Sequence, residues 1–144
     1  MKALEYFNDA EKLRIRQAVK EAELNTSGEI RIYIEDHCKG ELMDRAAFIF
    51  EEMKIHETAN RNGVLIYLAF SDKRFAVLGD AGIHIIVGND FWLSVKEMLI
   101  EQFKKGRYTD GLIAAIKEAG NVLQKHFPFE KGDTNELPDE AIIR

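Results

Sequence analysis

The stretch GVLIYLAFSDKRFAVLGD, residues 63–80, decides the fold. It predicts a β-hairpin, with strands at about 63–70 and 73–79 and a polar turn around Asp72. The first of these strands is almost wholly apolar, which is typical of a central strand covered on both faces of a sheet. The second strand returns the chain to the edge where the first begins, and there it delivers a lone carboxylate, Asp80.

A further strand is expected upstream, at 29–35, where EIRIYIE alternates polar and apolar residues. That alternation predicts a strand with one buried face and one solvent-facing face. A helix expected at 41–55 connects this strand to the one at 63–70 as a right-handed crossover, so these two strands run parallel. The strand at 73–79 is antiparallel to them because it belongs to the hairpin.

Three more helices are indicated by apolar residues at helical spacing. The first begins at Asn8, whose side chain is a good N-cap, and stops before the polar sequence at 25–28. Another follows 89–90 and ends at Gly106, and the last spans about 109–127.

The resulting order, α-β-α-β-β-α-α, predicts one small layered α/β domain with a mixed sheet over residues 1–127. Residues 128–144 are polar, contain the second proline and show no periodicity. We therefore expect them to form a loosely ordered C-terminal tail.

Composition excludes several classes of protein. At 144 residues, with 46% apolar and 31% charged, the chain is long enough for one well-buried core and too short for two ordinary domains. The formal net charge of -5 argues against a nucleic-acid partner, because phosphate binding needs clustered lysine and arginine. The longest apolar run, 64–70, is too short to span a bilayer, and no signal peptide is recognisable. We expect a cytoplasmic monomer without a membrane segment.

Familiar catalytic motifs are missing from the sequence. It contains no G-x-G-x-x-G, no G-x-x-x-x-G-K-[ST] and no G-x-S-x-G, which removes the common dinucleotide, P-loop and serine-hydrolase interpretations. Cys38 is the only cysteine, so the chain has no internal disulfide and no thiolate zinc site. The histidines show no H-x-x-x-H spacing.

The predicted topology gathers oxygen-bearing side chains at the edge where the parallel strands begin and the reversed strand ends. The residues expected there as metal ligands are Glu29, Asn62, Asp80 and Asp90. Carboxylates and amide carbonyls are the ligands that calcium and magnesium prefer, and the site is not an EF-hand because that loop pattern does not occur. Arg61 lies on the same rim and is a candidate contact for a phosphate group.

The same residues also have a structural explanation, which stays open. Asp80 and Asp90 are both suitable N-caps for the segments that follow them. Glu29 can be a strand residue that pairs with Arg31 or with Arg61. In that case the acidic edge serves capping and solubility alone.

The opposite edge is the other alternative. It carries Glu35, Asp36 and Asp72, and ligands of open α/β sheets usually bind beyond the carboxyl ends of the parallel strands. Against this, aspartate in a hairpin turn is most often a turn residue.

Three pieces of the sequence resemble a known family. They are TSGEI at 26–30, RNGVLIY at 61–67 and LGD at 78–80, in the order and spacing of the TPM domain, and the resemblance spans about 8–128. This resemblance implies a Rossmann-like three-layer α/β/α sandwich with a small mixed sheet.

The resemblance also bears on function. It implies divalent-metal binding, as described for bacterial members, or phosphatase activity, as described for a plant member. Glu29, Asn62 and Asp80 stand in the family's motif positions, and Asp90 precedes its Phe-Trp pair.

Three functions therefore remain in competition. The first is a module that binds calcium or magnesium at this edge and uses the occupied site to order loops or recruit a protein partner. The second is a metal-dependent acid phosphatase acting on phosphomonoesters, with Arg61 as its phosphate clamp. The third is an interaction scaffold without a ligand.

Overall fold

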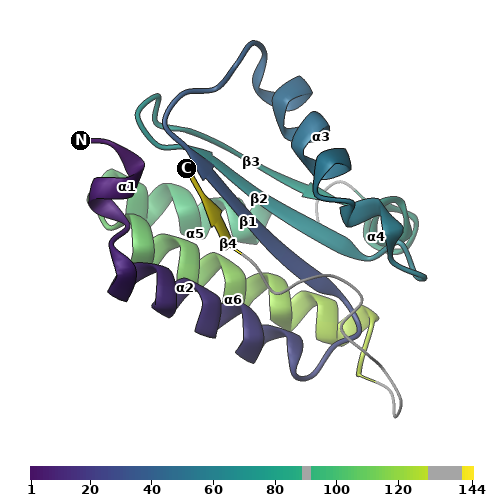
Figure 1. Ribbon diagram of the computed structural model, residues 1–144. Helices are drawn as coiled ribbons and strands as arrows, with labels where there is room; N and C mark the ends of the chain where they lie inside the picture. The colour runs from purple at the N-terminus through teal and green to yellow at the C-terminus, as the bar shows by residue number, and fades with distance from the viewer. Residues whose placement is uncertain (89–91, 130–140) are drawn as a thin grey trace.

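The computed structural model describes residues 1–88, 92–129 and 141–144. Figure 1 shows a central sheet with helices on both faces, which confirms the three-layer α/β/α sandwich. The elements in chain order are α1 (Ala3–Tyr6), α2 (Asp9–Glu23), β1 (Glu29–Glu35), α3 (Leu42–Glu52), the 3-10 turn η1 (Ile55–Glu57), β2 (Gly63–Ala69), β3 (Arg74–Gly79), α4 (Ala81–Val87), α5 (Leu93–Lys104), α6 (Tyr108–His126) and β4 (Ala141–Ile143).

The sheet has four strands in the order β3-β2-β1-β4. β1 and β2 are parallel, with Glu29 opposite Gly63, as the crossover predicts. β3 is antiparallel to β2, with Gly79 opposite Val64, as the hairpin predicts. The apolar strand β2 is therefore central, and all seven of its residues are buried.

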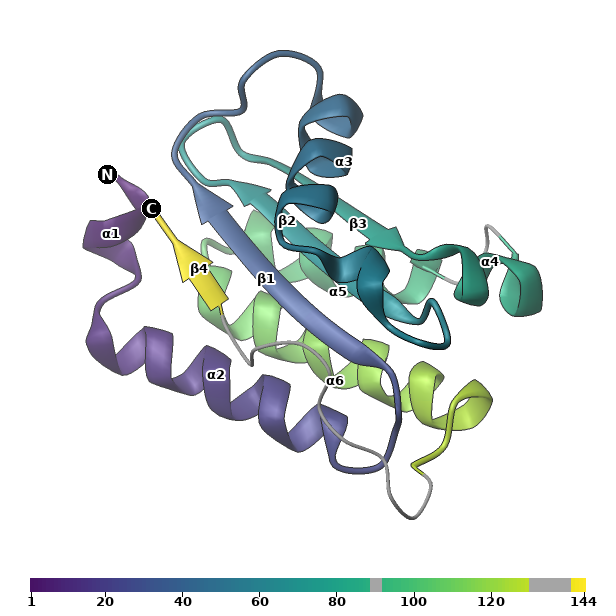
Figure 2. The ribbon, with the colours of Figure 1, turned by 45° about the vertical axis from the view of Figure 1, so that its right-hand side comes forward.

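The edge strand β4 was not expected. The C-terminal tail, for which the sequence predicts no regular structure, supplies Ala141–Ile143, and these residues pair in parallel with Ile32, Tyr33 and Ile34 of β1. A strand of three residues is too short to show a periodicity; parallel pairing with β1 and the packing of Ala141, Ile142 and Ile143 against the two cores place it. Both termini consequently lie at the same end of the sheet (Figures 1 and 2).

The sheet separates two apolar cores. One face packs against α2, α5 and α6, and the other packs against α3 (Figure 2). Along β1, Ile32 and Ile34 enter the first core, whereas Tyr33 enters the second together with Tyr67 of β2. Burying an apolar side chain of this size stabilises the fold by about 1.5–3 kcal/mol, so both layers contribute.

The prediction that β1 has a solvent-facing side is wrong. All seven of its residues are buried, the charged ones included. Arg31 forms an ion pair with Glu23 of α2 at 3.1 Å, and Glu35 forms one with Arg45 of α3 at 2.9 Å. The polar positions of EIRIYIE thus reflect buried ion pairs, which a period-two pattern cannot distinguish from solvent contact.

The helix ends follow local capping. Asn8 accepts a hydrogen bond from the backbone nitrogen of Glu11 at 3.0 Å, which confirms the predicted start of α2. α3 ends at Glu52, a little earlier than predicted, because Lys54 adopts the left-handed conformation at φ 58° and leaves only the short turn η1. The predicted order of elements has no helix at 81–87; only the suggestion that Asp80 caps the segment after it anticipates α4.

Within the part of the chain that the structure describes, no helix combines the length and the apolar character required to cross a bilayer.

Candidate metal centre

The backbone brings three of the predicted ligands to one edge of the sheet. The nitrogen of Asp80 donates to the oxygen of Gly63 at 3.0 Å, and the nitrogen of Glu29 donates to the oxygen of Asn62 at 3.4 Å. Glu29, Asn62 and Asp80 therefore lie at the ends of three adjacent chain segments. The fourth predicted ligand, Asp90, lies outside the described residues.

Asp80 has two roles in this structure. Its Oδ1 accepts from the backbone nitrogen of Ala81 at 2.7 Å, so the residue caps α4, as the structural explanation anticipated. Its carboxylate also accepts two hydrogen bonds from Arg61, from Nε to Oδ2 and from Nη2 to Oδ1, both at 2.8 Å. This bidentate pair is the strong form of an arginine–carboxylate contact. The Asp80 side chain is only 4% exposed.

Arg61 is held over Asp80 by an unusual backbone. Its φ of 50° lies in the left-handed region, which costs a residue with a Cβ some free energy. Its carbonyl accepts from the nitrogen of Gly82 at 2.9 Å. A Cβ at Gly82 would lie 2.1 Å from the oxygen of Asn60, so only glycine permits this close approach. The hydrogen bonds to Asp80 raise the pKa of Arg61 above its ordinary value, so the guanidinium stays charged.

Asn62 supplies an unpartnered oxygen. The residue is 1% exposed, its Nδ2 donates to Ser27 Oγ at 3.3 Å, and its backbone nitrogen donates to Thr58 Oγ1 at 3.1 Å. Its Oδ1 is buried and accepts no hydrogen bond from any residue that the structure describes. A buried acceptor costs about 1–3 kcal/mol unless a donor, a water molecule or an ion satisfies it.

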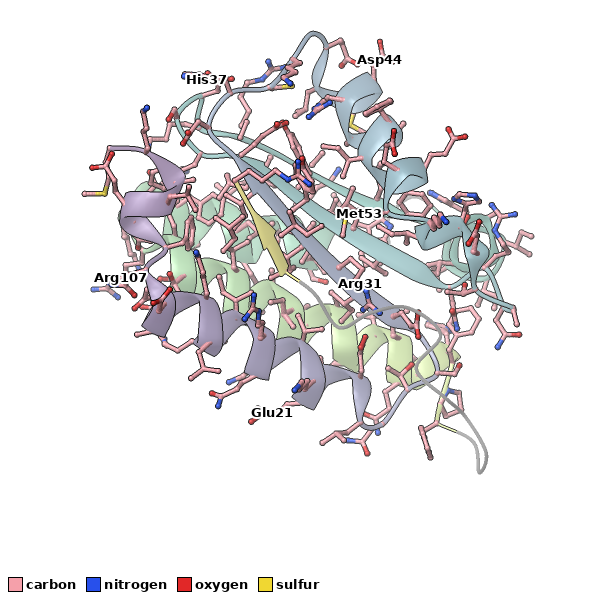
Figure 3. All side chains as sticks on the ribbon, viewed as in Figure 1. Glu21, Arg31, His37, Asp44, Met53 and Arg107 are labelled. Carbon is pink, nitrogen blue, oxygen red and sulfur yellow. The ribbon has the colours of Figure 1, made fainter. Side chains whose placement is uncertain are left out.

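Glu29 is held by a different partner. Its Oε2 lies 3.7 Å from Nη2 of Arg31, and both side chains are almost fully buried. Figure 3 places Arg31 toward the beginning of β1, at the opposite end of the sheet from His37. The sequence predicted that Glu29 pairs with Arg31 or Arg61. In the structure Glu29 pairs with Arg31, and Arg61 pairs with Asp80.

The comparisons with known proteins agree with this architecture. The family model of the TPM domain matches residues 2–122. The chain belongs to the TPM domain family. A search of curated proteins returned no match.

Two solved structures are similar to this chain. The BA42 protein from the psychrophilic bacterium Bizionia argentinensis is 40% identical, with a TM-score of 0.92 over 98% of this chain and 97% of that one. The N-terminal domain of the cg2496 protein from Corynebacterium glutamicum has a TM-score of 0.67 at 8% identity, over 83% of this chain and 76% of that one. The second likeness shows the fold alone.

The described part of this TPM domain contains no metal-binding cluster built only from histidine, cysteine, aspartate and glutamate. Across 1–88, 92–129 and 141–144, no three histidine, cysteine, aspartate or glutamate side chains are grouped to hold a metal ion. Of the predicted ligands, Glu29, Asn62 and Asp80 lie within the described residues.

At the opposite edge of the TPM domain, the carboxylates serve the fold. Asp36 accepts from the nitrogen of Ala3 at 2.6 Å. Asp72 accepts from the nitrogen of Cys38 at 2.7 Å and contacts His37 at 2.8 Å, which is the turn role expected of it. These contacts hold α1 and the loop after β1 in place.

Glu35, at the same edge, accepts hydrogen bonds from two other side chains. Two hydrogen bonds from Arg45, at 2.9 and 3.0 Å, and one from the hydroxyl of Tyr67 satisfy it. Burial raises the pKa of Glu35, but the hydrogen bonds from Arg45 and Tyr67 outweigh burial and leave this pKa below its ordinary value. The group stays ionised and paired.

Sequence reasoning missed two residues of the candidate metal centre. Thr58 closes the loop that carries Asn62, and Gly82 allows that loop to touch α4. A threonine four residues before Asn62 and a glycine two residues after Asp80 were visible signals, but their meaning depends on which segments meet in space.

Proposed function

We propose that this TPM domain binds a divalent cation, calcium or magnesium, at the edge of the sheet that carries both Asp80 and Asn62. The observation that carries the proposal is the buried, unpartnered Oδ1 of Asn62, in the residue directly after the arginine that neutralises Asp80. An amide carbonyl and a carboxylate are oxygen ligands of the kind that hard cations take.

The proposed ligands differ in how readily they can serve. The oxygen of Asn62 needs no competing hydrogen bond to be broken among the described residues. Asp80 must first be released by Arg61, and Glu29 by Arg31. Asp90 completes the proposed set, with water filling the remaining positions. A site with so few charged ligands binds weakly, with a dissociation constant of about 10⁻⁴ to 10⁻³ M.

Cation binding at this site would regulate the arrangement of α4 and the loop before β2. Asp80 caps α4, and the loop before Asn62 contacts α4 through Gly82. A bound cation would add bonds to both sides of that contact and stabilise one arrangement of loop and helix. A protein partner that recognises this arrangement would bind in a cation-dependent way.

Calorimetric titration of the metal-stripped protein with calcium and with magnesium tests the proposal. We expect saturable binding that Asp80→Asn weakens by about ten-fold or more, because the site loses a ligand charge. Asn62→Ala, which leaves the net charge unchanged, weakens it as well. Asp72→Asn makes the same charge change at the opposite edge and leaves affinity unchanged. Equal losses from Asp72→Asn and Asp80→Asn would refute a local site.

A metal-dependent acid phosphatase is the second candidate. The half-exposed guanidinium of Arg61 at the rim favours it, because arginine binds phosphate oxygens well. In the structure, however, this guanidinium faces Asp80. Hydrolysis of p-nitrophenyl phosphate by protein loaded with magnesium or calcium provides the assay. The activity must disappear in Asp80→Asn, and turnover that this variant retains belongs to a contaminant.

An interaction scaffold without a ligand is the remaining alternative. It requires that Glu29→Gln and Asp80→Asn change neither the response to metal nor the capture of a partner.

A further inference from the structure

We propose that Arg61 is an internal competitor for the cation site: its guanidinium binds the Asp80 carboxylate and leaves it when a divalent cation binds. This inference rests on the proposed function and adds the way in which the site is regulated. In this account Arg61 controls the affinity for the cation without being one of its ligands.

The contacts of Asp80 leave little room for two cations. Arg61 Nε and Nη2 lie 2.8 Å from Oδ2 and Oδ1, and Oδ1 also accepts from Ala81. The guanidinium fork thus covers both carboxylate oxygens at once. A calcium or magnesium ion at Asp80 would have to displace at least one of these bonds, and the two positive charges would repel each other.

The two members of the pair differ in how easily they can move. The Asp80 side chain is 4% exposed and the Arg61 side chain is 51% exposed. Asp80 is also fixed by its backbone bond to Gly63 and by its cap on α4. About half of the Arg61 side chain already faces solvent, so the exchange proceeds by departure of the arginine.

The loop keeps the arginine close after it leaves. The carbonyl of Arg61 accepts from Gly82, and the missing Cβ of Gly82 lets residues 60–61 rest against α4. Arg61, whose carbonyl makes this contact, has a left-handed backbone conformation. Since these are backbone features, they hold whether or not the side chain covers Asp80, and the guanidinium returns when the cation dissociates.

Competition of this kind lowers the apparent affinity by the fraction of time for which the site is open. If the ion pair is closed in about nine molecules of ten, removal of the guanidinium strengthens cation binding about ten-fold. The effect should lie mainly in the association rate, because the arginine must open before the cation enters.

Calcium titrations of the wild-type chain, Arg61→Ala and Arg61→Lys test the inference. We expect Arg61→Ala to bind about ten-fold more tightly than wild type. Arg61→Lys keeps the charge but loses the fork, and we expect an intermediate affinity because lysine does not make the bidentate bond. Arg74→Ala removes the same charge at the far end of β3 and should leave affinity unchanged.

The outcomes separate the inference from the function on which it rests. If wild type binds calcium and Arg61→Ala binds no more tightly, the competitor role is refuted and the cation site stands. If Arg61→Lys matches wild type while Arg61→Ala is tighter, the effect is general electrostatics and the competitor role is also refuted. If no variant binds calcium, both proposals fall. If only the Arg61 variants bind, both are supported.

Discussion

At the scale of single residues, the buried carboxylates Glu29, Glu35 and Asp80 each pair with an arginine of their own. Glu35 shows the principle most clearly, because it is buried beneath α3 and accepts from Arg45 and Tyr67. Burial and the bond to Glu35 raise the pKa of Tyr67, so its hydroxyl remains a donor at all ordinary pH values. The network holds α3 to the sheet.

Glu35→Gln is expected to lower the free energy of unfolding at pH 7 by about 3 kcal/mol, because the largely covered guanidinium of Arg45, 13% exposed, loses its charged partner. The folded pKa of Glu35 lies below its ordinary value of 4.5, so its contribution is complete above that value. It is lost as the pH falls through the folded pKa. Urea denaturation at pH 7 and at about pH 3 should therefore show a difference that shrinks in acid.

A surface control accompanies this measurement. Glu52→Gln makes the same change on the exposed side of α3 and should stay within about 0.5 kcal/mol of wild type. A difference between wild type and Glu35→Gln that is equally large at both pH values would contradict the ionic account of Glu35.

At the scale of elements, the contact between α4 and the loop before β2 shapes the candidate site. α4 begins at Asp80, and Gly82 in its first turn touches the carbonyls of Asn60 and Arg61. A glycine inside a helix ordinarily weakens it relative to alanine. Here the absence of a Cβ is what allows Arg61 to reach Asp80.

Gly82→Ala should therefore destabilise the protein, against the usual direction of a glycine-to-alanine change in a helix. The added Cβ would lie 2.1 Å from the oxygen of Asn60, so loop and helix must separate. We expect a loss of about 1–3 kcal/mol in thermal unfolding, with altered amide shifts at Arg61 and Asn62. His84→Ala, on the exposed side of α4, is the control. A stabilised Gly82→Ala protein would show that the contact is unimportant.

At the scale of the whole molecule, β4 brings the C-terminal residues back to the sheet, where they pair with β1. This strand turns β1 into an internal strand of the sheet and places the C-terminus beside α1 (Figure 1). The nitrogen of Arg144 donates to the oxygen of Ile34 at 2.8 Å, so the pairing continues to the last residue.

A chain that ends at residue 140 should remain folded and be less stable. It loses a few backbone hydrogen bonds and the burial of Ala141, which together are worth about 1–3 kcal/mol. Urea denaturation measures the loss, and Arg144→Ala serves as a control because it keeps β4 intact. An unchanged midpoint would mean that β4 contributes nothing to the sheet.

The sequence predicted the features that local patterns encode. The hairpin, the parallel crossover and the Asn8 cap follow from runs and spacings within short windows. β4 was not predicted because its three residues are too few to show a periodicity. The predicted solvent-facing side of β1 was wrong because residues in buried ion pairs give the same alternating pattern as exposed polar residues. The edge at which Asp80 lies followed from topology. The pairing of Asp80 with Arg61 did not, because that contact depends on the left-handed backbone of Arg61 and on the close approach of α4 to the loop before β2.

The most direct test of the central claim is residue-resolved NMR of the metal-stripped protein during titration with calcium and magnesium. The proposed function predicts saturable shift changes centred on Asn62 and Asp80, extending to Arg61 as its side chain leaves the carboxylate. Changes confined to Asp36 and Asp72, or no changes at all, would contradict a cation site at this edge of the sheet.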